Sequence, residues 1–457
     1  MDRRVIDVVD VTTRAELGAM PIIVTLMCGL LGACDGLDNQ ALAFTAPVIA
    51  AQWGHKMPAF VPVFTVGLIG LMVGSFVGGW FGDRFGRKKA LLIAALCFGV
   101  TTFLTPWCTT LQQLMIVRFV GGLGIGGLPS ALAALIAETV PERSRATLTL
   151  WALVGIPFGG FVGGFAASWM IPAYGWQSVF YAAGAVSIVV LLLFALLVSE
   201  STHFLTLRGQ QRKRVAAILG RLDPKGGYTD ADEFVLPPAD QKITSVAALF
   251  TESRGRMTLL FWGAEIIELM IFYVLVNWTP TLFREAGIPI ERAVLGTAAL
   301  NMGAILATIA LGPVCARFGE QRVTAATFVV TSVALLVMVA GAGNLTFMMV
   351  GVFFAGAGCI GGQAAVVMLM AKRYPTAIRS LGVGWALTVG RIGSIISPTV
   401  VGLPLAWGWS SYQILMLPIV PSLLGALCVA LAHPVTDLSG MLPQPPLSSA
   451  RKAAIKG

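Results

Sequence analysis

The chain has 457 residues, of which 56% are hydrophobic and only 12% are charged, and its mean hydropathy is +0.83. A water-soluble domain carries roughly 25% charged residues because its whole surface must be solvated. The composition therefore excludes a soluble cytosolic enzyme, a disordered chain and a disulfide-stapled secreted scaffold, and it places the chain in a lipid bilayer. A net charge of +9 would also suit a nucleic-acid-binding protein, but the 31 Lys and Arg residues form no stripe.

The first segment, residues 1–17, is charged and mildly amphipathic, and we expect a cytoplasmic N-terminal segment followed by a retained span rather than a cleaved signal peptide. Apolar runs of about 20 residues, the length that crosses the hydrocarbon core as a helix, then follow one another. Six begin near Gly18, Pro58, Ala90, Thr110, Ala146 and Tyr174, and six more begin near Met257, Glu291, Arg322, Asn344, Leu381 and Gly408.

One long polar segment divides these twelve runs six and six. We predict an N-terminal six-helix bundle over 18–199, a cytoplasmic linker over 200–256 with some amphipathic helix at its start, a C-terminal six-helix bundle over 257–432 and a cytoplasmic tail over 433–457. With the N-terminus inside, 26 Lys and Arg residues fall in cytoplasmic segments and three fall on the other side. This bias predicts that both termini are cytoplasmic, and it explains the net charge without nucleic acid.

The two groups of six runs share sequence. GWFGDRFGRKK from Gly79 matches GPVCARFGEQR from Gly312, and PERSRATLTLWAL from Pro141 matches PTAIRSLGVGWAL from Pro375, at offsets of 233 and 234. Two loops that agree on the offset to one residue indicate two repeats related by an axis along the membrane normal. Such repeats place a substrate site between the halves, near the middle of the bilayer.

The repeated loops are the predicted elements of conformational change. Gly82 and Gly86 suit a tight turn, and Asp83 can cap a helix or pair with a cation. The second copy has Ala316 where the first has Asp83, so an aspartate-based latch is expected only in the N-terminal half. The residues expected to act in gating are Gly82, Asp83, Arg84, Gly86, Arg87, Glu138, Arg145 and Arg379.

Six ionisable residues lie inside predicted spans, where a charge is costly and usually functional. Asp35 and Asp38 share one helix face, Glu265 and Glu268 share another, and Arg118 and Arg391 are single cations. The four acids are candidate proton-binding groups, and either arginine could hold a carboxylate. The alternative for an individual aspartate is a permanent structural ion pair with an arginine.

These motifs resemble a known family. GDRFGRKK after the second span is similar to the loop signature of the major facilitator superfamily, and the likeness covers essentially the whole chain. CDGLDNQALAFTAPVIAAQWG from Cys34 resembles the first-helix DGxD signature of the aromatic acid/proton symporter family, and TAIRSLGVGWALTVGRIGSIISP from Thr376 is similar to its eleventh helix. The resemblance implies an all-α membrane protein with twelve transmembrane helices in two pseudo-symmetric bundles, which is not an enzyme.

The resemblance also implies proton-coupled import of an aromatic carboxylate, such as a hydroxybenzoate, across a bacterial inner membrane to feed aromatic hydrocarbon catabolism. By position, Asp35 and Asp38 match the acids needed for coupling, and Arg118, Glu138 and Arg391 match family residues in the fourth and eleventh helices. Relatives usually carry a neutral polar residue at the position of Glu268, so this chain has an extra acid in its seventh helix. We expect a monomer that needs no cofactor or metal.

An aromatic substrate also needs apolar ring contacts and a few polar groups. The candidates, each with ordinary packing as its alternative, are Asn39, Phe44, Tyr273, Asn277, Trp278, Gln363 and Trp385.

Two other functions remain open. A proton/drug antiporter shares GDRFGRKK and RFVGGLG, although Gly155 to Gly160 reads GIPFGG rather than GPxxGG; a non-transporting ligand sensor is opposed by a short central loop without a signalling module.

Overall fold

The computed structural model describes residues 4–209, 211–237, 245–341 and 343–432. Twelve helical spans in these ranges are long and apolar enough to cross a membrane, which confirms the predicted all-α membrane fold. Each span begins within a few residues of its predicted start. The predicted tail, 433–457, lies outside the described residues.

The six spans of the N-terminal half include two that are interrupted or extended by short 3-10 turns. In the fourth, Gly127 separates two helices, and Pro129 follows in the first turn of the second, where its missing N–H is not needed. The spans are α2 (Ala19–Gln52), η1 with α3 (Met57–Phe60, Val61–Phe85), α4 with η2 (Arg87–Leu104, Thr105–Trp107), α5 with α6 (Leu111–Gly126, Leu128–Thr139), α7 (Glu142–Tyr174) and α8 (Gln177–Leu197).

The C-terminal half has the same number of spans. Its last span is divided near Pro418 into two helices. The spans are α11 (Gly255–Glu285), α12 (Ile290–Phe318), α13 (Glu320–Ala340), α14 (Leu345–Arg373), α15 (Arg379–Ala406) and α16 with α17 (Ser411–Met416, Ile419–Leu431).

Equivalent helices pack against each other in the two halves. The pairs α2 with α7, α3 with α5 and α4 with α8 recur as α11 with α15, α12 with α14 and α13 with α17. A Cβ added at Gly70 would lie 2.3 Å from a backbone oxygen of α5, and one added at Gly303, 233 residues later, would lie 1.9 Å from a backbone oxygen of α14. The repeat inferred from the loops is therefore a repeat of packing.

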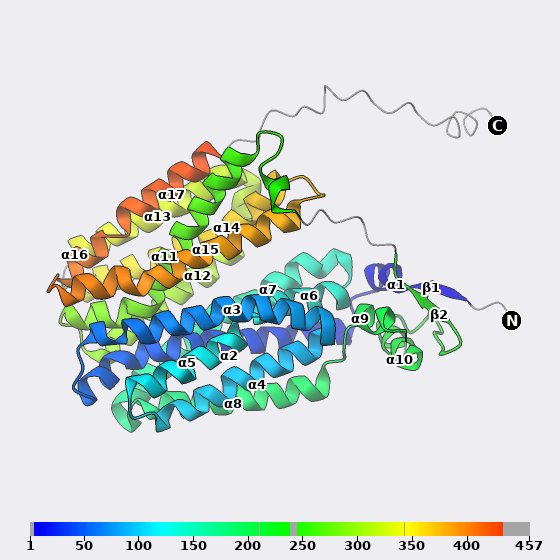
Figure 1. The fold of residues 1–457 in the computed structure, drawn as a ribbon, viewed down its shortest axis with the longest axis horizontal. Coiled ribbons are helices and arrows are strands. Elements are labelled where there is room, and N and C mark those ends of the chain that lie inside the picture. Colours follow the sequence, from blue (N-terminus) through cyan, green and yellow to red (C-terminus); the bar gives the residue numbers. More distant parts are fainter. Residues whose placement is uncertain (1–3, 210, 238–244, 342, 433–457) are drawn as a thin grey trace.

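The halves lie side by side, and α7 packs on α12, α3 on α15 and α2 on α11 (Figure 1). We call the end of the bundle that carries Arg84, Arg87 and Arg317 the basic end, and the other the opposite end. Contacts between the halves toward the opposite end include a hydrogen bond from Arg284 Nη1 to the Pro47 carbonyl, at 2.6 Å. A Cβ at Gly402 would also lie only 1.9 Å from the Val61 side chain, so the halves are closely packed there.

A small unit at the basic end joins the N-terminal segment to the linker. Strand β1 (Val5–Asp7) pairs in parallel with β2 (Glu233–Val235), beside the helices α1 (Val8–Arg14), α9 (Thr202–Leu207) and α10 (Arg212–Leu222) (Figure 1). A 3-10 turn, η3 (Val246–Leu249), precedes α11. The apolar face of α10 and residues of α1 and α9 form its core. Helix at the start of the linker was expected from the sequence, whereas this strand pairing was not.

Candidate functional site

Asp38 belongs to a closed ion pair inside the N-terminal half. Its Oδ1 lies 3.3 Å from Arg118 Nη1 and also accepts a hydrogen bond from the Thr102 hydroxyl. Arg118 Nη2 donates to Thr105 Oγ1 at 2.7 Å, and the guanidinium carbon lies 5.3 Å from the centre of the Phe180 ring. Both charged side chains are buried. This arrangement matches the structural ion pair that the sequence left open for one aspartate.

Asp35, one turn earlier on α2, has a different environment. It is buried, and its Oδ1 has no hydrogen-bond partner among the residues that the structure describes. The charges that act on it are those of Asp38 and of Arg391, which belongs to α15 in the other half. The two aspartates share a helix face, but only Asp38 is paired with an arginine of its own half.

Arg391 lies where the two halves meet. Its charge acts on Asp35 of α2 and on Glu265 of α11, and the Tyr273 side chain is close to both Arg391 and Asn39. It is only partly buried, and within the described ranges it forms no ion pair. A partly accessible guanidinium without a fixed carboxylate partner is suited to bind an anion through two parallel hydrogen bonds.

A narrow pocket lies beside the Asp38 and Arg118 pair. Asn39 and Phe64 also line it from the N-terminal half, and Asn277 lines it from α11. The space open to water-sized molecules is about 40 Å³, whereas sites for drug-sized ligands occupy roughly 300 Å³ or more. The halves must separate further before an aromatic molecule fits here.

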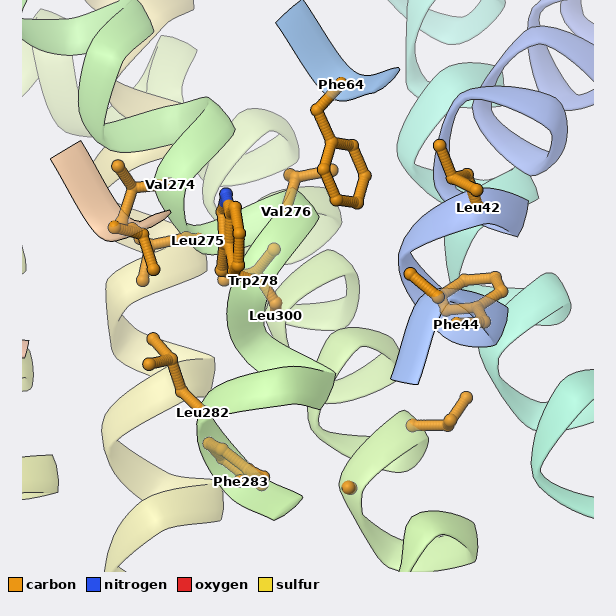
Figure 2. Packing of buried hydrophobic residues seen from close by; sticks show 14 of the residues in the cluster. Leu42, Phe44, Phe64, Val274, Leu275, Val276, Trp278, Leu282, Phe283 and Leu300 are labelled. Atoms are coloured by element: carbon orange, nitrogen blue, oxygen red, sulfur yellow. The ribbon is translucent and has the colours of Figure 1, made fainter. Parts of the chain in front are cut away.

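The predicted aromatic residues Trp278 and Phe44 lie in different surroundings, and Trp278 has an aromatic neighbour, Phe64, that was not predicted from the sequence. The rings of Phe64 and Trp278 lie 5.5 Å apart across the interface of the halves, and Trp278 Nε1 has no hydrogen-bond partner in the described part of the chain (Figure 2). Phe44 belongs to the same buried cluster (Figure 2). It is fully buried, and a Cβ at Gly163 of α7 would lie 3.3 Å from its ring. The rings of Phe64 and Trp278 border the interface, and Phe44 packs against α7 of its own half within a cluster that includes residues of both halves.

Two other predicted substrate residues lie apart from these rings. Trp385 stacks on Trp262, with ring centres 6.4 Å apart, and is 37% exposed toward the basic end. Gln363 is half-buried on α14. Neither is among the residues that line the pocket.

The acids of α11 point into the C-terminal half. Glu265 packs beside Gly390 of α15, and Glu268 points toward Gly362 of α14. Both are buried. The structure therefore places Asp35, Arg391 and Glu265 around the interface and places Glu268 behind them.

The loop between α3 and α4 holds a charge network at the basic end. Arg87 Nη1 lies 2.5 Å from Asp83 Oδ1, and Arg87 Nε lies 3.3 Å from Glu138 Oε1 of α6. Gly86 adopts a φ of 109°, which favours glycine, and Arg84 lies over the rings of Trp80 and Phe85. A Cβ at Gly82 would meet the Arg87 guanidinium at 3.3 Å. Five of the predicted gating residues thus meet in one loop, with Glu138 as its partner on α6.

The equivalent site of the C-terminal half carries the same pair with the charges exchanged. Glu320 stands where the first copy has Arg87, and it pairs with Lys372, which stands where the first copy has Glu138. The C-terminal half thus has an ion pair at this site although Ala316 replaces the aspartate. Comparison of the two loop sequences alone did not suggest this pair. Among the described residues, the side-chain hydrogen bonds of Arg145 and Arg379 are local, to the Val140 carbonyl and the Thr376 hydroxyl respectively, at 3.4 Å.

Some polar residues of the interface were missed by the sequence analysis. Gln40 of α2 and Asn301 of α12 exchange hydrogen bonds across the halves, at 2.7 and 3.2 Å, and both are buried. Amides within apolar runs were the available signal, but Asn39, Asn277 and Gln363 were the amides predicted from the sequence, and Gln40 and Asn301 were not among them.

A further contact that was not predicted lies within the N-terminal half. Glu200 accepts a hydrogen bond from the Lys88 N–H at 2.9 Å and so binds the linker to the start of α4.

Comparison with known proteins gives consistent results. The family model described as Major Facilitator Superfamily matches residues 28–307. The chain is 31% identical to the 4-hydroxybenzoate transporter PcaK of Acinetobacter baylyi, over 91% of this chain and 92% of that protein. It is 32% identical to a gallate transporter of Pseudomonas putida, over 93% of this chain and 94% of that protein.

Among solved structures, the inward open conformation of the xylose transporter XylE from E. coli has a TM-score of 0.73 to this chain. The alignment covers 93% of this chain and 100% of that chain, at 16% identity. At this identity the likeness concerns the fold alone.

Proposed function

Because this chain belongs to the major facilitator superfamily, in the family of its aromatic acid transporters, we propose that it imports an aromatic carboxylate together with protons. The observation that carries the proposal is the placement of Asp35 and Arg391. Among the described residues, Asp35 Oδ1 has no hydrogen-bond partner and Arg391 forms no ion pair. The two side chains approach each other from opposite halves.

The substrate class is inferred from the relatives and from the chemistry of the interface. Arg391 would hold the carboxylate, and Tyr273 and Asn39 lie near enough to bind it or a ring hydroxyl. Phe64 and Trp278 offer ring faces at the same interface, and the indole N–H of Trp278 could donate to a ring substituent. A hydroxybenzoate combines these features.

Coupling follows from competition for Arg391. A charged Asp35 and a substrate carboxylate are both attracted to this guanidinium and repel each other. Protonation of Asp35 removes the competing charge, so substrate and proton bind together. Once both charges are neutralised the halves can close around the cargo and open on the other side. Asp38, held by Arg118 and Thr102, stabilises the N-terminal half during this movement.

We further propose that the basic end faces the cytoplasm of a bacterium, with the chain in the inner membrane as a monomer. The excess of Lys and Arg at this end supports the orientation. The close contacts between the halves lie toward the opposite end, so this structure would be the conformation sealed from the periplasm. The network of Asp83, Arg87 and Glu138 would then hold the cytoplasmic ends of α3, α4 and α6 together while the halves move.

Uptake of radiolabelled 4-hydroxybenzoate into proteoliposomes tests the proposal. We expect accumulation when the outside is acidic, a clearly lower accumulation ratio with Asp35→Asn, and unchanged accumulation with Asp230→Asn, a matched change at an exposed linker position. Asp35→Asn should still exchange internal for external substrate, since exchange needs no proton release. Uptake driven only by an acidic interior would instead indicate antiport, and binding without any flux would indicate a sensor.

A further inference from the structure

The two acids of α11 are buried groups that the coupling scheme above does not use. Glu265 is 0% and Glu268 is 2% exposed. Both carboxylate oxygens of Glu265 and Oε1 of Glu268 lack a hydrogen-bond partner among the residues that the structure describes. An ionised carboxylate in such a place costs several kcal/mol unless a cation compensates it. Each group must therefore hold a proton or share a positive charge during part of the transport cycle.

The neighbouring helices supply little positive charge. Arg391 of α15 acts on Glu265, whereas Glu268 lies beside Glu265 and the Cys359 thiol of α14. A Cβ at Gly362 would lie 3.3 Å from Glu268 Oε1 and 2.8 Å from the Thr327 hydroxyl, so these two polar groups approach the same point from α11 and α13.

The remaining helices around α11 offer no second cation at this level in the part of the chain that the structure describes. From α2 the facing group is Asp35, which acts on Tyr273 and is itself an acid. On α17 the titratable side chain is Cys428, beside Gly263, and on α16 it is Tyr412. The charged residues of α12, Glu291, Arg292 and Arg317, lie in its first and last turns.

Arg391 is thus shared between one acid of each half. Its charge acts on Asp35 from the N-terminal half and on Glu265 from the C-terminal half. A substrate carboxylate that binds this guanidinium takes the positive charge from both acids at once. Proton binding then becomes favourable for both Asp35 and Glu265. Because Glu268 lies directly behind Glu265, the two glutamates cannot both carry a negative charge.

On the basis of the proposed function, we infer that Glu265 and Glu268 form a second proton-binding site, so that each aromatic carboxylate enters with two protons. One proton is carried by Asp35 and one by the pair of glutamates. Two protons and one monoanion bind from outside and leave inside, so each cycle moves one net positive charge inward. Transport should therefore respond to membrane potential, whereas a one-to-one symporter of a monoanion would not.

A proton fits this site better than a metal cation. A metal ion needs several oxygen, nitrogen or sulfur ligands at fixed distances, and no group of three His, Cys, Asp or Glu side chains that could hold one occurs among the described residues. Dependence of uptake on sodium is accordingly an outcome that contradicts the inference.

The test uses the full-length protein in proteoliposomes with equal pH on both sides and a potassium diffusion potential set by valinomycin. An inside-negative potential of about 59 mV should concentrate 4-hydroxybenzoate about tenfold, since that potential corresponds to a factor of ten per charge. With no potential, a gradient of one pH unit should concentrate it about 100-fold with two protons and about tenfold with one.

Glu265→Gln is expected to lose the response to potential and to lower the pH-driven ratio to about tenfold, and Glu268→Gln should weaken the response. Glu285→Gln, an exposed position at the end of the same helix, is the matched control and should behave like the unaltered protein. Substrate exchange measures whether each variant is folded and binds.

The unaltered protein decides the matter even if a variant does not fold. Uptake driven by a pH gradient but insensitive to potential overturns the two-proton inference and leaves the proposed function intact. Loss of uptake when sodium is replaced by a large organic cation overturns the assignment of the site to protons. A protein that transports no aromatic acid under any gradient overturns the proposed function itself.

Discussion

The two aspartates of α2 provide a sharp test, because substitution of neighbouring acids should have different effects on stability. Asp38 is the partner of a buried arginine, whereas Asp35 forms no ion pair with an arginine of its own half in the part of the chain that the structure describes. Asp38→Asn leaves the buried Arg118 charge without compensation, and removal of one partner of a buried pair costs about 3–5 kcal/mol. Asp35→Asn removes a buried acid and should leave stability unchanged or higher.

The expected shift in melting temperature follows from these energies. A cooperative unit of 150–250 residues, the size of one half, loses about 2–4 °C for each kcal/mol. Asp38→Asn should thus lower the melting temperature by roughly 6–20 °C, as a product of these two ranges. Thermal unfolding of purified protein in detergent, followed by the fluorescence of its 11 Trp residues, measures the shift.

A double variant separates loss of the ion pair from a general packing defect. Arg118→Gln combined with Asp38→Asn removes both charges, and replacement of a whole buried pair is often nearly neutral. We therefore expect the double variant to melt well above Asp38→Asn alone. The reasoning is refuted if Asp35→Asn and Asp38→Asn lower the melting temperature equally, or if the effects of Asp38→Asn and Arg118→Gln simply add.

Three further predictions concern the anion site, the interface and the helix crossings. Arg391→Lys should raise the KM for an aromatic carboxylate about ten- to hundredfold, because a lysine forms one charged hydrogen bond where the guanidinium forms two. Initial uptake rates measure the KM, and an unchanged KM would show that Arg391 does not bind the carboxylate. Gln40→Leu leaves the Asn301 amide partly unsatisfied and should lower the stability by about 1–3 kcal/mol. The double variant Gln40→Leu with Asn301→Leu should lose less stability in thermal unfolding, and a loss equal to or larger than that of Gln40→Leu alone would contradict a coupled pair. Gly36→Ala places a Cβ 1.8 Å from a backbone oxygen of α7 and should prevent stable folding, while Gly384→Ala, with nothing within 4 Å, should be tolerated; comparable yields of monodisperse protein would show that this crossing can relax.

Much of the architecture could be predicted because the bilayer imposes strong constraints. Apolar runs long enough to cross it gave starts close to those of α2 and α11, and the offset between the Gly79 and Gly312 loops predicted two equivalent halves. The pairing of β1 with β2 could not be anticipated, since each strand is only three residues long and they are more than 200 residues apart. Short strands carry too little periodicity to be detected.

The site was predictable in kind but not in detail. A charge within a span is conspicuous in sequence, so Asp35, Asp38, Arg118 and Arg391 were all identified as candidates. Which acid meets which arginine depends on helix rotation and crossing, which no local pattern reports. Thr102, whose hydroxyl donates to Asp38, is an ordinary residue in its own run and becomes relevant only through that contact.

By itself, the order of amino acids determined that this chain spans a membrane twelve times, that its halves are copies, and that a few charges are held in the membrane interior. These properties depend on solvation and on repetition along the chain, which are visible one segment at a time. Only the tertiary structure decided that Asp38 is committed to Arg118 while Arg391 is shared between Asp35 and Glu265. Charges interact over a few ångströms in space, and helices separated by hundreds of residues meet only when the two halves pack together.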